Sequence, residues 1–395
     1  MRWLLQVINV TWFGLQSLPQ RLGSSAAAVF GIAGVVGVLI GVLSIAQGFR
    51  AALTTAGSDD MAIVLRSGST SEMVSGLSRD DILVVADTEG VARDAEGALS
   101  SAELFVIIDL PKRSTNTTAN VPLRGVGEQA FEVRGDVQIV EGRMFEWGRN
   151  EVIVGVGAAQ EFAGLELGGS LEVANDDWRI VGLFAAAGGI SESEIWTDAR
   201  LLQSAYRRGD SYQSVYTRLN TPEAFTTFKD ELDTDPRVDL QVSRSSDYYS
   251  SQSTLVTNLI TVVGFLIASL MALGAVFGAV NTMYSAVSAR TREIATLRAL
   301  GFKSGPVIVS VMVESLLLAV LGSVVGGAAA WIIFDGTRAA TMNWQSFSQV
   351  TFAFRVTPQL LVMGGIIAVL IGLVGGLFPA WRAARMPIAM GLRES

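Results

Sequence analysis

The chain alternates between long stretches without charged residues and segments that are rich in them. Four such stretches run from Leu22 to Phe49, Tyr248 to Ala289, Ser304 to Phe334 and Val356 to Trp381, with Glu314 as the only charged exception. A helix needs about 20 apolar residues to cross the ~30 Å hydrocarbon core of a membrane, and each stretch is long enough. Buried helices of a large soluble protein rarely run this far without a charge. The pattern therefore predicts four transmembrane helices.

Between the first and second stretches lies a segment of ordinary soluble composition. Ala51–Asp247 carries 17 Lys/Arg and 33 Asp/Glu over 197 residues, a net charge of −16. The segments at the other ends of the stretches, Met1–Ser25, Ser285–Gly305 and Arg382–Ser395, together hold nine basic and two acidic residues. The positive-inside rule places these three segments in the cytoplasm. We therefore expect both termini inside, and the acidic segment and the Asp335–Arg355 loop outside.

The first 21 residues are a separate case. Apolar residues recur at helical spacing from Leu4 to Leu18, and polar residues interrupt the run. This pattern is typical of an amphipathic helix that lies on a membrane surface. A secretory signal peptide is the alternative, because Arg2 precedes an apolar run that ends near small residues. The polar interruptions favour the interfacial helix.

The acidic segment has the pattern of an α+β domain. Apolar and β-branched runs between turn-rich residues predict strands at Met61–Leu65, Glu103–Leu110, Val121–Val126, Glu151–Val154, Ser170–Val173, Trp178–Phe184, Ser214–Leu219 and Val238–Val242. Helices are predicted at Arg79–Ala86, Ala158–Phe162, Asp198–Tyr206 and Pro222–Leu232, the last capped by Thr221. The predicted fold class is thus a membrane α-helical protein of four transmembrane helices, with an α+β extracytoplasmic domain inserted between helices 1 and 2.

These predictions divide the chain into successive segments. No Gly or Pro occurs between Asp247 and Gly264, so we expect the second transmembrane helix to continue outward as a stalk. The expected boundaries are an interfacial helix at 1–21, transmembrane helix 1 at 22–49, the outward domain at 50–247, the stalk with transmembrane helix 2 at 248–284, a cytoplasmic helix at 285–303, transmembrane helix 3 at 304–334, an outward loop at 335–355, transmembrane helix 4 at 356–381 and a cytoplasmic tail at 382–395.

The segment Ser285–Gly301 joins two transmembrane helices and reads SAVSARTREIATLRALG. Its Ala, Leu, Arg and Glu content favours a helix that ends at Gly301. The expected apolar face consists of Val287, Ile294, Leu297 and Leu300, with Arg290, Arg292, Glu293 and Arg298 elsewhere, and Arg290 and Glu293 are spaced to pair. Because both of its ends are attached to membrane helices, such a helix moves only with them and acts as a lever. A solvated connector is the alternative.

The chemistry available to the chain is narrow. It contains neither His nor Cys, which excludes the usual zinc sites, thiol nucleophiles, imidazole bases and disulfides. The overall charge of −8 argues against nucleic acid as a partner. No G-x-x-x-x-G-K-[ST] motif is present, so we expect no bound nucleotide, no other cofactor and no metal. The sequence predicts a non-catalytic subunit that contacts membrane lipids.

Each predicted transmembrane helix contains two glycines four residues apart. Such spacing permits close helix packing within or between subunits. The pairs are Gly37 with Gly41, Gly274 with Gly278, Gly322 with Gly326 and Gly372 with Gly376.

Glu314 is the one ionisable residue within the predicted transmembrane helices. A charge at the centre of a membrane helix costs on the order of 2.5–3.5 kcal/mol, so the carboxylate is expected to be protonated, partnered or facing water. The structural interpretation is a hydrogen bond to a neighbouring residue such as Asn281, Ser285 or Ser310. Proton coupling is the alternative.

Three parts of the sequence resemble one family. Ala289–Gly301 is similar to the cytoplasmic helix pattern R-x-x-E-I-[AG]-x-L-[RK]-A-[LI]-G of ABC transporter permeases of the MacB/FtsX/LolC type, and Glu314-Ser315-Leu316 and Gly322 follow in the next helix. The tail Phe378–Arg385 resembles the family's Y-P-A-x-x-A-A ending. Glu141–Phe145, Glu151–Gly155 and Val181-Gly182 resemble its periplasmic core. Together these similarities extend over nearly the whole chain.

The resemblance implies a bacterial inner-membrane permease with a periplasmic domain. In this family the helix corresponding to Ala286–Gly301 docks onto a cytoplasmic ATPase that binds ATP and Mg²⁺, and two permeases pair. Because the chain starts at the first transmembrane helix, we expect the ATPase to be a separate polypeptide. The resemblance also implies that the outward domain divides into a membrane-proximal part, 59–120 with 199–247, and an inserted part, 121–198.

The expected function is mechanotransmission. ATP-driven motion would pass through the stalk to the outward domain, which would export or extract a substrate, with a periplasmic adaptor protein as a possible further partner. Few ionisable residues lie in the transmembrane helices, which suits this mode better than an alternating-access channel. Two alternatives stay open: activation of cell-wall hydrolases as in FtsX, and lipoprotein release as in LolC. A sensor or scaffold without an ATPase is a more distant one.

Overall fold

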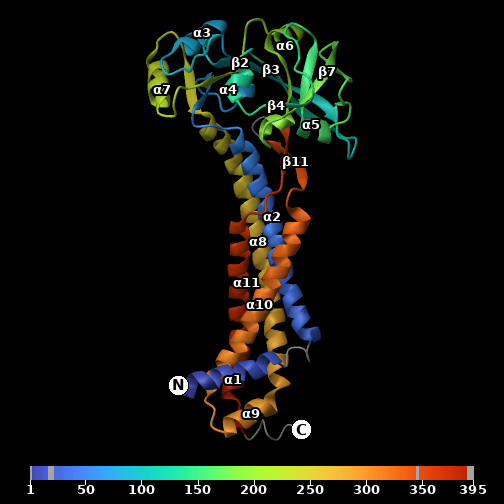
Figure 1. Cartoon of the computed structure of the whole chain (residues 1–395), viewed down its shortest axis with the longest axis vertical. Helices are drawn as coiled ribbons and strands as arrows, with labels where there is room; N and C mark the ends of the chain where they lie inside the picture. Colours follow the sequence, from blue (N-terminus) through green and yellow to red (C-terminus); the bar gives the residue numbers. More distant parts are fainter. Residues whose placement is uncertain (1, 17–21, 344–346, 389–395) are drawn as a thin grey trace. The chain divides into compact units, whose positions relative to one another are not determined.

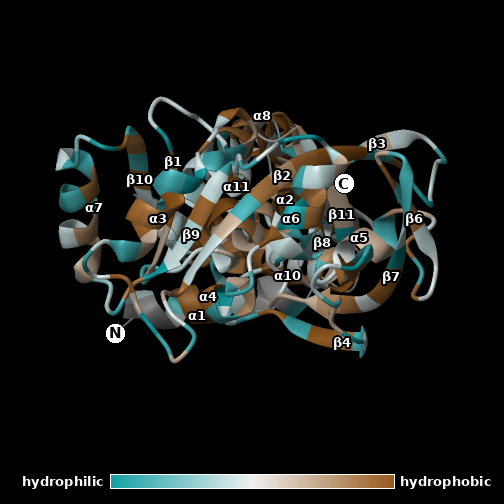
Figure 2. Ribbon diagram, turned by 90° about the horizontal axis from the view of Figure 1, so that it is seen from above, coloured by the Kyte–Doolittle hydropathy of each residue, from teal (hydrophilic) through white to brown (hydrophobic). Residues whose placement is uncertain are grey.

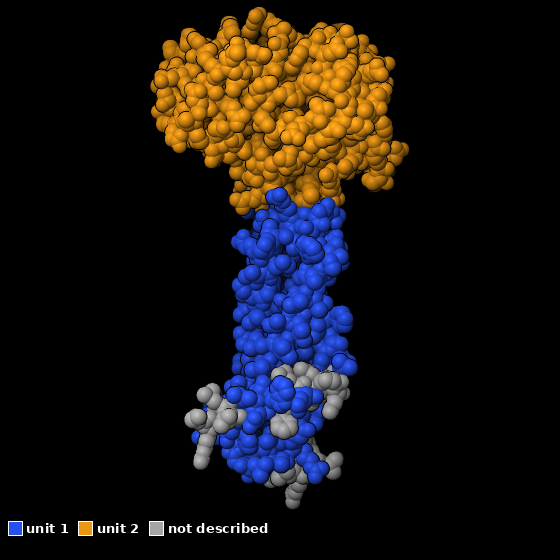
Figure 3. Space-filling model, in the orientation of Figure 1, with its two compact units in different colours: residues 1–47, 258–337, 354–395 blue, residues 48–257, 338–353 orange. Residues whose placement is uncertain are grey.

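The computed structural model describes residues 2–16, 22–343 and 347–388, which form two compact units. Figure 3 colours the two units separately. Unit 1 comprises Met1–Gln47, Asn258–Thr337 and Phe354–Ser395, and unit 2 comprises Gly48–Thr257 and Arg338–Ala353.

Unit 1 is built from helices. Four of the described helices are long and apolar enough to cross a membrane, namely α2 (Leu22–Thr55), α8 (Ser245–Ser288), α10 (Ser304–Phe334) and α11 (Pro358–Arg385). They run side by side in Figure 1. Two shorter helices complete the unit, α1 (Arg2–Gln16) and α9 (Thr291–Ala299). The predicted class of four membrane-spanning helices with an inserted domain is confirmed.

Helix α1 contacts α10 within unit 1. The Ser310 hydroxyl donates a hydrogen bond to the Val10 carbonyl oxygen at 3.1 Å, and Val10 is buried. Helix α1 lies within the predicted interfacial helix over 1–21. At Val10 it packs against α10, another helix of the same chain. Residues 17–21 lie outside the described residues.

Glycines lie at the closest helix contacts of unit 1. A Cβ at Gly322 would approach the Val29 carbonyl oxygen to 2.9 Å, and a Cβ at Gly372 would approach the Ala319 Cβ to 2.6 Å. The same crowding holds at Gly41, Gly326 and Gly376, while Gly37 has an ordinary contact at 3.5 Å. By contrast, neither glycine of the α8 pair, Gly274 with Gly278, has a neighbour within 4 Å of a built Cβ. The predicted pairs of α2, α10 and α11 therefore take part in tight packing within the chain, whereas α8 approaches α2 and α11 closely at other positions, Gly264 and Gly375.

Unit 2 contains a ten-stranded sheet in the order β10-β1-β9-β2-β3-β8-β5-β7-β4, with β6 paired to β7. Its strands are β1 (Met61–Arg66), β2 (Ser100–Pro111), β3 (Thr118–Val126), β4 (Gln138–Gly142), β5 (Glu151–Gly155), β6 (Ser170–Val173), β7 (Asp176–Ala185), β8 (Ile195–Asp198), β9 (Ser214–Arg218) and β10 (Leu240–Arg244). Figure 2 shows long hydrophobic stretches along β2 and β3, which supply the centre of the sheet.

Helices cover this sheet. They are α3 (Arg79–Asp87), α4 (Ala130–Arg134), α5 (Val156–Glu161), α6 (Ala199–Ala205) and α7 (Ala224–Thr234), together with the 3-10 turns η2 (Glu72–Val74) and η3 (Ile190–Ser193). Helix α3 begins with a capping box in which Ser78 and Asp81 satisfy each other's backbone N–H groups. The N-cap of α7 is Glu223, so the expected cap at Thr221 is displaced, although the Thr221 hydroxyl accepts a 3.4 Å bond from the Ala224 N–H.

The structure corrects three expectations about this domain. The sequence patterns did not predict strands β4 and β8, because each strand is short and lacks a clear alternation of apolar and polar residues. The expected 335–355 loop contains a hairpin of β11 (Arg338–Asn343) and β12 (Ser348–Ala353), which belongs to unit 2 because Val350 and Phe352 are buried. Residues 344–346 lie outside the described residues.

The expected division at residues 121 and 198 is also displaced. Residues 100–103 of β2 pair with β9, whereas residues 104–111 pair with β3. Leu104, Val106 and Leu202 share one hydrophobic cluster with Trp178 and Phe162. The second cluster gathers side chains from β1, β9, β10 and α7. The two cores therefore separate within β2 and after α6, since one strand serves both.

Candidate functional site

The loop between α8 and α10 contains a shorter helix than the sequence indicates. Helix α8 continues to Ser288, and α9 begins after Arg290, which is its N-cap, and ends at Ala299. Gly301 follows with a φ of +95°, a conformation that glycine adopts without strain. The expected single helix over 285–303 is therefore two helices with a break at Ala289-Arg290, and the predicted end at glycine is reproduced.

One face of α9 is anchored in unit 1. Thr291, Ile294 and Ala295 are buried, and Ile294 shares a hydrophobic cluster with Met283 and Val287 of α8. Residues of α2, α10 and α11 complete the same cluster. Leu297 is half-buried, but Leu300 is 73% exposed, so the expected face that included Leu300 is wrong. The helix ends one residue earlier, and Leu300 projects beyond its last turn.

Arg290 and Glu314 form a buried ion pair. The Arg290 Nη1 lies 3.2 Å from the Glu314 Oε2, and the side chains are only 12% and 3% exposed. The expected pairing of Arg290 with Glu293 is therefore wrong. Glu314 is partnered, which is one of its expected states, but the partner is Arg290 and none of the three suggested neighbours. The Ser310 hydroxyl bonds to Val10 and the Ser285 hydroxyl bonds to the Asn281 carbonyl, while Asn281 itself is exposed. The pair ties the start of α9 to α10.

The remaining polar residues of α9 point away from the core. Arg292 and Glu293 are exposed. Arg298 is half-buried, and its Nη1 donates to the Met386 carbonyl oxygen beyond the end of α11. Arg292, Glu293 and, just beyond the helix, Leu300 are thus exposed, while Thr291, Ile294 and Ala295 of the same helix are buried.

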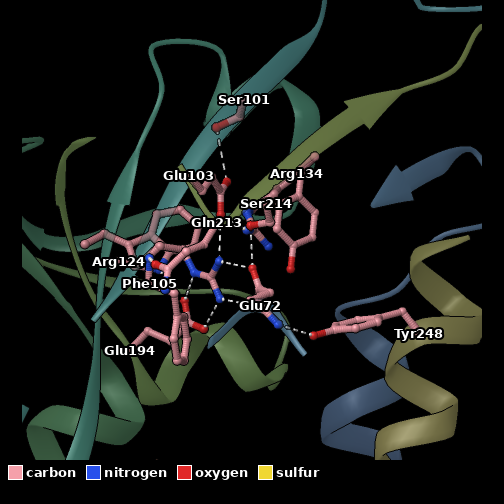
Figure 4. Close-up of polar contacts among 12 residues, drawn as sticks. Glu72, Ser101, Glu103, Phe105, Arg124, Arg134, Glu194, Gln213, Ser214 and Tyr248 are labelled. Carbon is pink, nitrogen blue, oxygen red and sulfur yellow. Dashed lines mark hydrogen bonds and ion pairs between the residues drawn. The ribbon is translucent and has the colours of Figure 1, made fainter. Parts of the chain in front are cut away.

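A second site is a buried charge cluster in unit 2, formed by Glu72, Glu103, Arg124, Arg134 and Glu194 (Figure 4). Arg124 lies on β3 and uses all five of its N–H donors. Its Nη1 donates to Glu72 at 2.7 Å and Glu103 at 2.8 Å, its Nη2 to Glu72 at 3.1 Å and Glu194 at 2.8 Å, and its Nε to Glu194 at 2.8 Å. A guanidinium offers no further donor.

Aromatic rings and a second arginine enclose this cluster. The Arg134 Nη2 donates to Glu103 at 2.6 Å, and its guanidinium lies 4.1 Å from the ring centre of Tyr216. Burial alone raises the pKa of Glu72, but the charge of Arg124 and its hydrogen bonds outweigh burial and leave that pKa below its ordinary value. Burial likewise lowers the pKa of Arg124, but the negative charges of Glu194 and Glu72 outweigh burial and leave that pKa above its ordinary value. Glu72 and Arg124 therefore both carry their charges at neutral pH.

The cluster is linked to the first turns of α8. The Glu72 backbone N–H donates to the Tyr248 hydroxyl at 3.2 Å, and the Tyr216 and Tyr249 hydroxyls are 2.9 Å apart. In the same region of unit 2 the Asn343 side chain of β11 donates to Gln252 of α8 at 2.9 Å. The start of α8 is thus hydrogen-bonded to the cluster residue Glu72 through Tyr248, to the sheet through Tyr249 and, separately, to the hairpin through Gln252.

Sequence reasoning missed this cluster. Its members come from four separate elements and from the residue between η3 and β8, and the one visible signal was Arg124 within the apolar run Val121–Val126. Over the part of the chain that the structure describes, no group of His, Cys, Asp or Glu is arranged to hold a metal ion. The three carboxylates instead share arginines, so the arrangement stabilises structure and has no evident reactive centre.

Two family models match the chain. Residues 25–235 match the MacB-like periplasmic core domain, and residues 265–388 match the FtsX-like permease C-terminal domain. The first match alone covers more than half of the chain and the second follows it in order.

Named relatives agree with these matches. The macrolide export ATP-binding/permease protein MacB 1 of Aeromonas hydrophila is 23% identical over 378 residues, covering 91% of this chain and 56% of the relative. The corresponding MacB of Escherichia coli is 23% identical over 348 residues, covering 78% and 49%. This chain therefore spans about half the length of these curated relatives.

A solved structure was also found. The periplasmic region of MacB from Actinobacillus actinomycetemcomitans aligns with a TM-score of 0.38 at 13% identity, covering 51% of this chain and 95% of that chain. With four helices able to span a membrane and both family domains matched in order, the chain belongs to the ABC transporter permeases of the MacB/FtsX type.

Proposed function

We propose that this multi-pass membrane protein is the permease subunit of an ABC transporter that transmits ATP-driven motion. A separate ATPase would bind ATP and Mg²⁺ and push on α9, and unit 2 would respond by exporting or extracting a substrate. In this arrangement α9 and the termini are cytoplasmic and unit 2 is periplasmic. The family assignment and the charge distribution of the sequence support the proposal.

The observation that carries the proposal is the continuity of α8. This helix runs without interruption over 44 residues, Ser245–Ser288, with its first turns in unit 2 and its later turns in unit 1. A continuous helix transmits displacement along its axis because every turn is hydrogen-bonded to the next. Only Ala289 and Arg290 separate it from α9.

Both ends of α8 are held by side chains. At its start, Tyr248 and Tyr249 bond to the buried charge cluster and its neighbour Tyr216. At its end, Val287 packs in the cluster that holds α9, which is also tied to α10 through Arg290. A push on α9 would therefore displace α8, and movement of α8 would exert force on the sheet of unit 2.

The middle of α8 leaves room for a second copy of the chain. Only 11% of its most apolar window is buried, and Leu259, Leu266, Leu273 and Phe277 are exposed. Lipid or a second permease would cover this face. The exposed small residues Gly274 and Gly278 support the latter, because they permit close approach of another helix. A homodimer, with a periplasmic adaptor protein bound to unit 2, completes the proposed assembly.

Breaking α8 tests the transmission step. Insertion of Gly-Gly after Thr254 should interrupt the helix, and the control is the same insertion after Ala95, which is exposed in a bend of unit 2. The chain has no native cysteine, so a single cysteine introduced in unit 2 can carry a fluorophore. We expect ATP to change its emission in the reconstituted complex and in the control, but not in the α8 insertion. An unchanged response in the α8 insertion would refute the transmission step.

Substitution of Leu300 tests the docking step. Leu300→Asp places a charge at an exposed position, so folding should be unaffected, whereas contact with an ATPase should be lost. Leu83→Asp is the matched control, because Leu83 is 60% exposed on α3 of unit 2. In the complex with Leu300→Asp, we expect the permease no longer to influence the rate of ATP hydrolysis. In the complex with Leu83→Asp, this influence should remain. Equal effects of the two variants would exclude α9 as the docking element.

The same complexes distinguish the alternative outputs. Release of a lipoprotein from vesicles would identify a LolC-like activity, and activation of a cell-wall hydrolase without release of any molecule would identify an FtsX-like activity. Export of a small molecule would support the efflux function that the names of the relatives describe for those proteins.

A further inference from the structure

A hollow of about 630 Å³ lies in unit 1 where the ends of α8 and α11 meet the start of α9. Tyr284, Val287 and Ser288 line it from α8, and Thr291 lines it from α9. The other wall consists of Phe378, Trp381, Arg382 and Arg385 of α11, with Met386 and Pro387. One part of the hollow is therefore apolar, and the other part is basic.

The two arginines are held by rings. The Arg382 guanidinium lies 5.5 Å from the ring centre of Tyr284, and the Arg385 guanidinium lies 4.3 Å from that of Trp381. Within the described residues neither arginine has a carboxylate partner, and no Asp or Glu lines the hollow. Cation–π contacts fix a guanidinium without neutralising its charge. The hollow therefore presents two oriented positive charges to an incoming group.

The hollow also lies at the limit of the membrane-spanning segments. Helix α11 is uncharged from its start to Trp381, and α8 is uncharged through Ser288 after its first turn. Trp and Tyr concentrate at the level of lipid headgroups, where one end of the ring is in contact with apolar chains and the other with water. Trp381 and Phe378 are both more than half exposed, so they face the surroundings of the bundle.

We propose that this hollow binds an acidic phospholipid. The phosphate would accept hydrogen bonds from Arg382 and Arg385, and the Ser288 hydroxyl lies in the same lining for the remaining headgroup oxygens. The acyl chains would lie along Phe378 and Trp381. A zwitterionic lipid would be disfavoured because its ammonium group would meet two arginines and no carboxylate. The site goes beyond the proposed function, because binding does not depend on an ATPase.

Native mass spectrometry of the full chain tests this proposal. The protein is extracted from nanodiscs that contain phosphatidylcholine and about 20% phosphatidylglycerol. The lipids that remain bound to the protein are then identified. We expect selective retention of phosphatidylglycerol. In the double variant Arg382→Gln/Arg385→Gln, its affinity should fall about 30-fold, roughly fivefold for each arginine near a membrane surface. Arg382→Lys/Arg385→Lys should retain most of the binding, because the charges remain.

The matched control is Arg50→Gln/Arg355→Gln. Both arginines are exposed, and neither lines the hollow. Arg50 lies on α2, and Arg355 lies just before the start of α11, whereas Arg382 and Arg385 lie at the end of α11. The control should retain phosphatidylglycerol as the unmodified chain does. Equal loss in the control would show a general effect of charge, and would overturn the site. Unchanged retention in the Arg382→Gln/Arg385→Gln variant would also overturn it and would indicate that these arginines face a protein partner.

A test of folding accompanies each variant. Circular dichroism and size-exclusion chromatography in detergent should match those of the unmodified chain, because the substituted arginines are exposed. If Arg382→Gln/Arg385→Gln misfolds, Trp381→Leu provides the second test. It removes the ring that orients Arg385 while keeping an apolar side chain, and should lower phosphatidylglycerol retention by a smaller factor. Full retention in Trp381→Leu would then count against the proposal.

Discussion

Replacement of Arg124 by methionine should strongly destabilise unit 2. The side chain of Arg124 is 2% exposed and donates five hydrogen bonds to three buried carboxylates. Methionine fills a similar volume between Phe105 and Tyr216 but supplies no donor. Glu72 and Glu194 would each lose their principal partner, whereas Glu103 would keep Arg134. The variant thus leaves uncompensated negative charge within the domain.

The expected loss follows from the cost of unpaired buried charges. Removing one partner of a buried ion pair costs about 3–5 kcal/mol, and here one substitution affects three carboxylates. The free energy of unfolding should therefore fall by at least ~3 kcal/mol. With a denaturant slope of about 2 kcal/mol per molar urea, the unfolding midpoint moves by roughly 1.5–2.5 M. Arg124→Lys should have an intermediate effect, because lysine keeps the charge with three donors instead of five.

The effect should depend on pH in a defined direction. In the unmodified protein the folded-state pKa of Glu72 lies below its unfolded value near 4.5, so its contribution is present above that pH and is lost as pH falls through the folded-state pKa. In Arg124→Met the hydrogen bonds from Arg124 and its charge are lost and only the charge of Arg134 still opposes burial, so we expect the folded-state pKa of Glu72 to rise above the unfolded value. Protonation of this carboxyl at lower pH then removes a buried negative charge and stabilises the folded variant. The difference in unfolding free energy should therefore shrink between pH 8 and pH 5.

Pulse proteolysis of the full chain in detergent and urea measures this difference, with fragments assigned to unit 2 by mass spectrometry. Arg113→Met is the matched control, because the Arg113–Glu166 pair is exposed and such pairs contribute little to stability. A change below 1 kcal/mol for Arg124→Met at pH 8 would refute the reasoning. A difference that grows towards pH 5 would refute the assignment of the loss to the carboxylates.

Two further predictions concern unit 1. Glu314→Gln should lower the thermal stability of the purified chain, because it leaves the buried Arg290 charge without its carboxylate. Adding Arg290→Gln to the same chain should recover part of that loss. If no stability is recovered, the two side chains are not coupled. Gly326→Val should prevent assembly of the helices, because its side chain would overlap the Ala33 carbonyl group, whereas Gly278→Val should leave the stability of the monomer unchanged, since open space surrounds Gly278. Size-exclusion chromatography and thermal unfolding followed by tryptophan fluorescence compare these two variants, and equal stability of both would contradict the packing described above.

Much of the architecture is determined by local sequence. The four uncharged stretches predicted α2, α8, α10 and α11, because a membrane-spanning helix requires a contiguous run of apolar residues that can be counted. The absence of Gly and Pro after Asp247 likewise predicted the extension of α8 beyond its apolar part. Gly301 marked the end of α9 for a similarly local reason, since a positive φ is a property of one residue.

Other features were decided by tertiary structure alone. Arg290 contacts Glu314 instead of Glu293, because packing of α9 against α10 brings the buried carboxylate within reach, and sequence spacing describes only neighbours on one helix. Arg124 collects carboxylates that lie 21, 52 and 70 residues away in the chain. The hairpin of β11 and β12 belongs to unit 2 although 93 residues, 245–337, separate it from β10. Sequence patterns determine which residues must leave water, whereas the choice of partner for each buried charge depends on which distant elements the fold brings together.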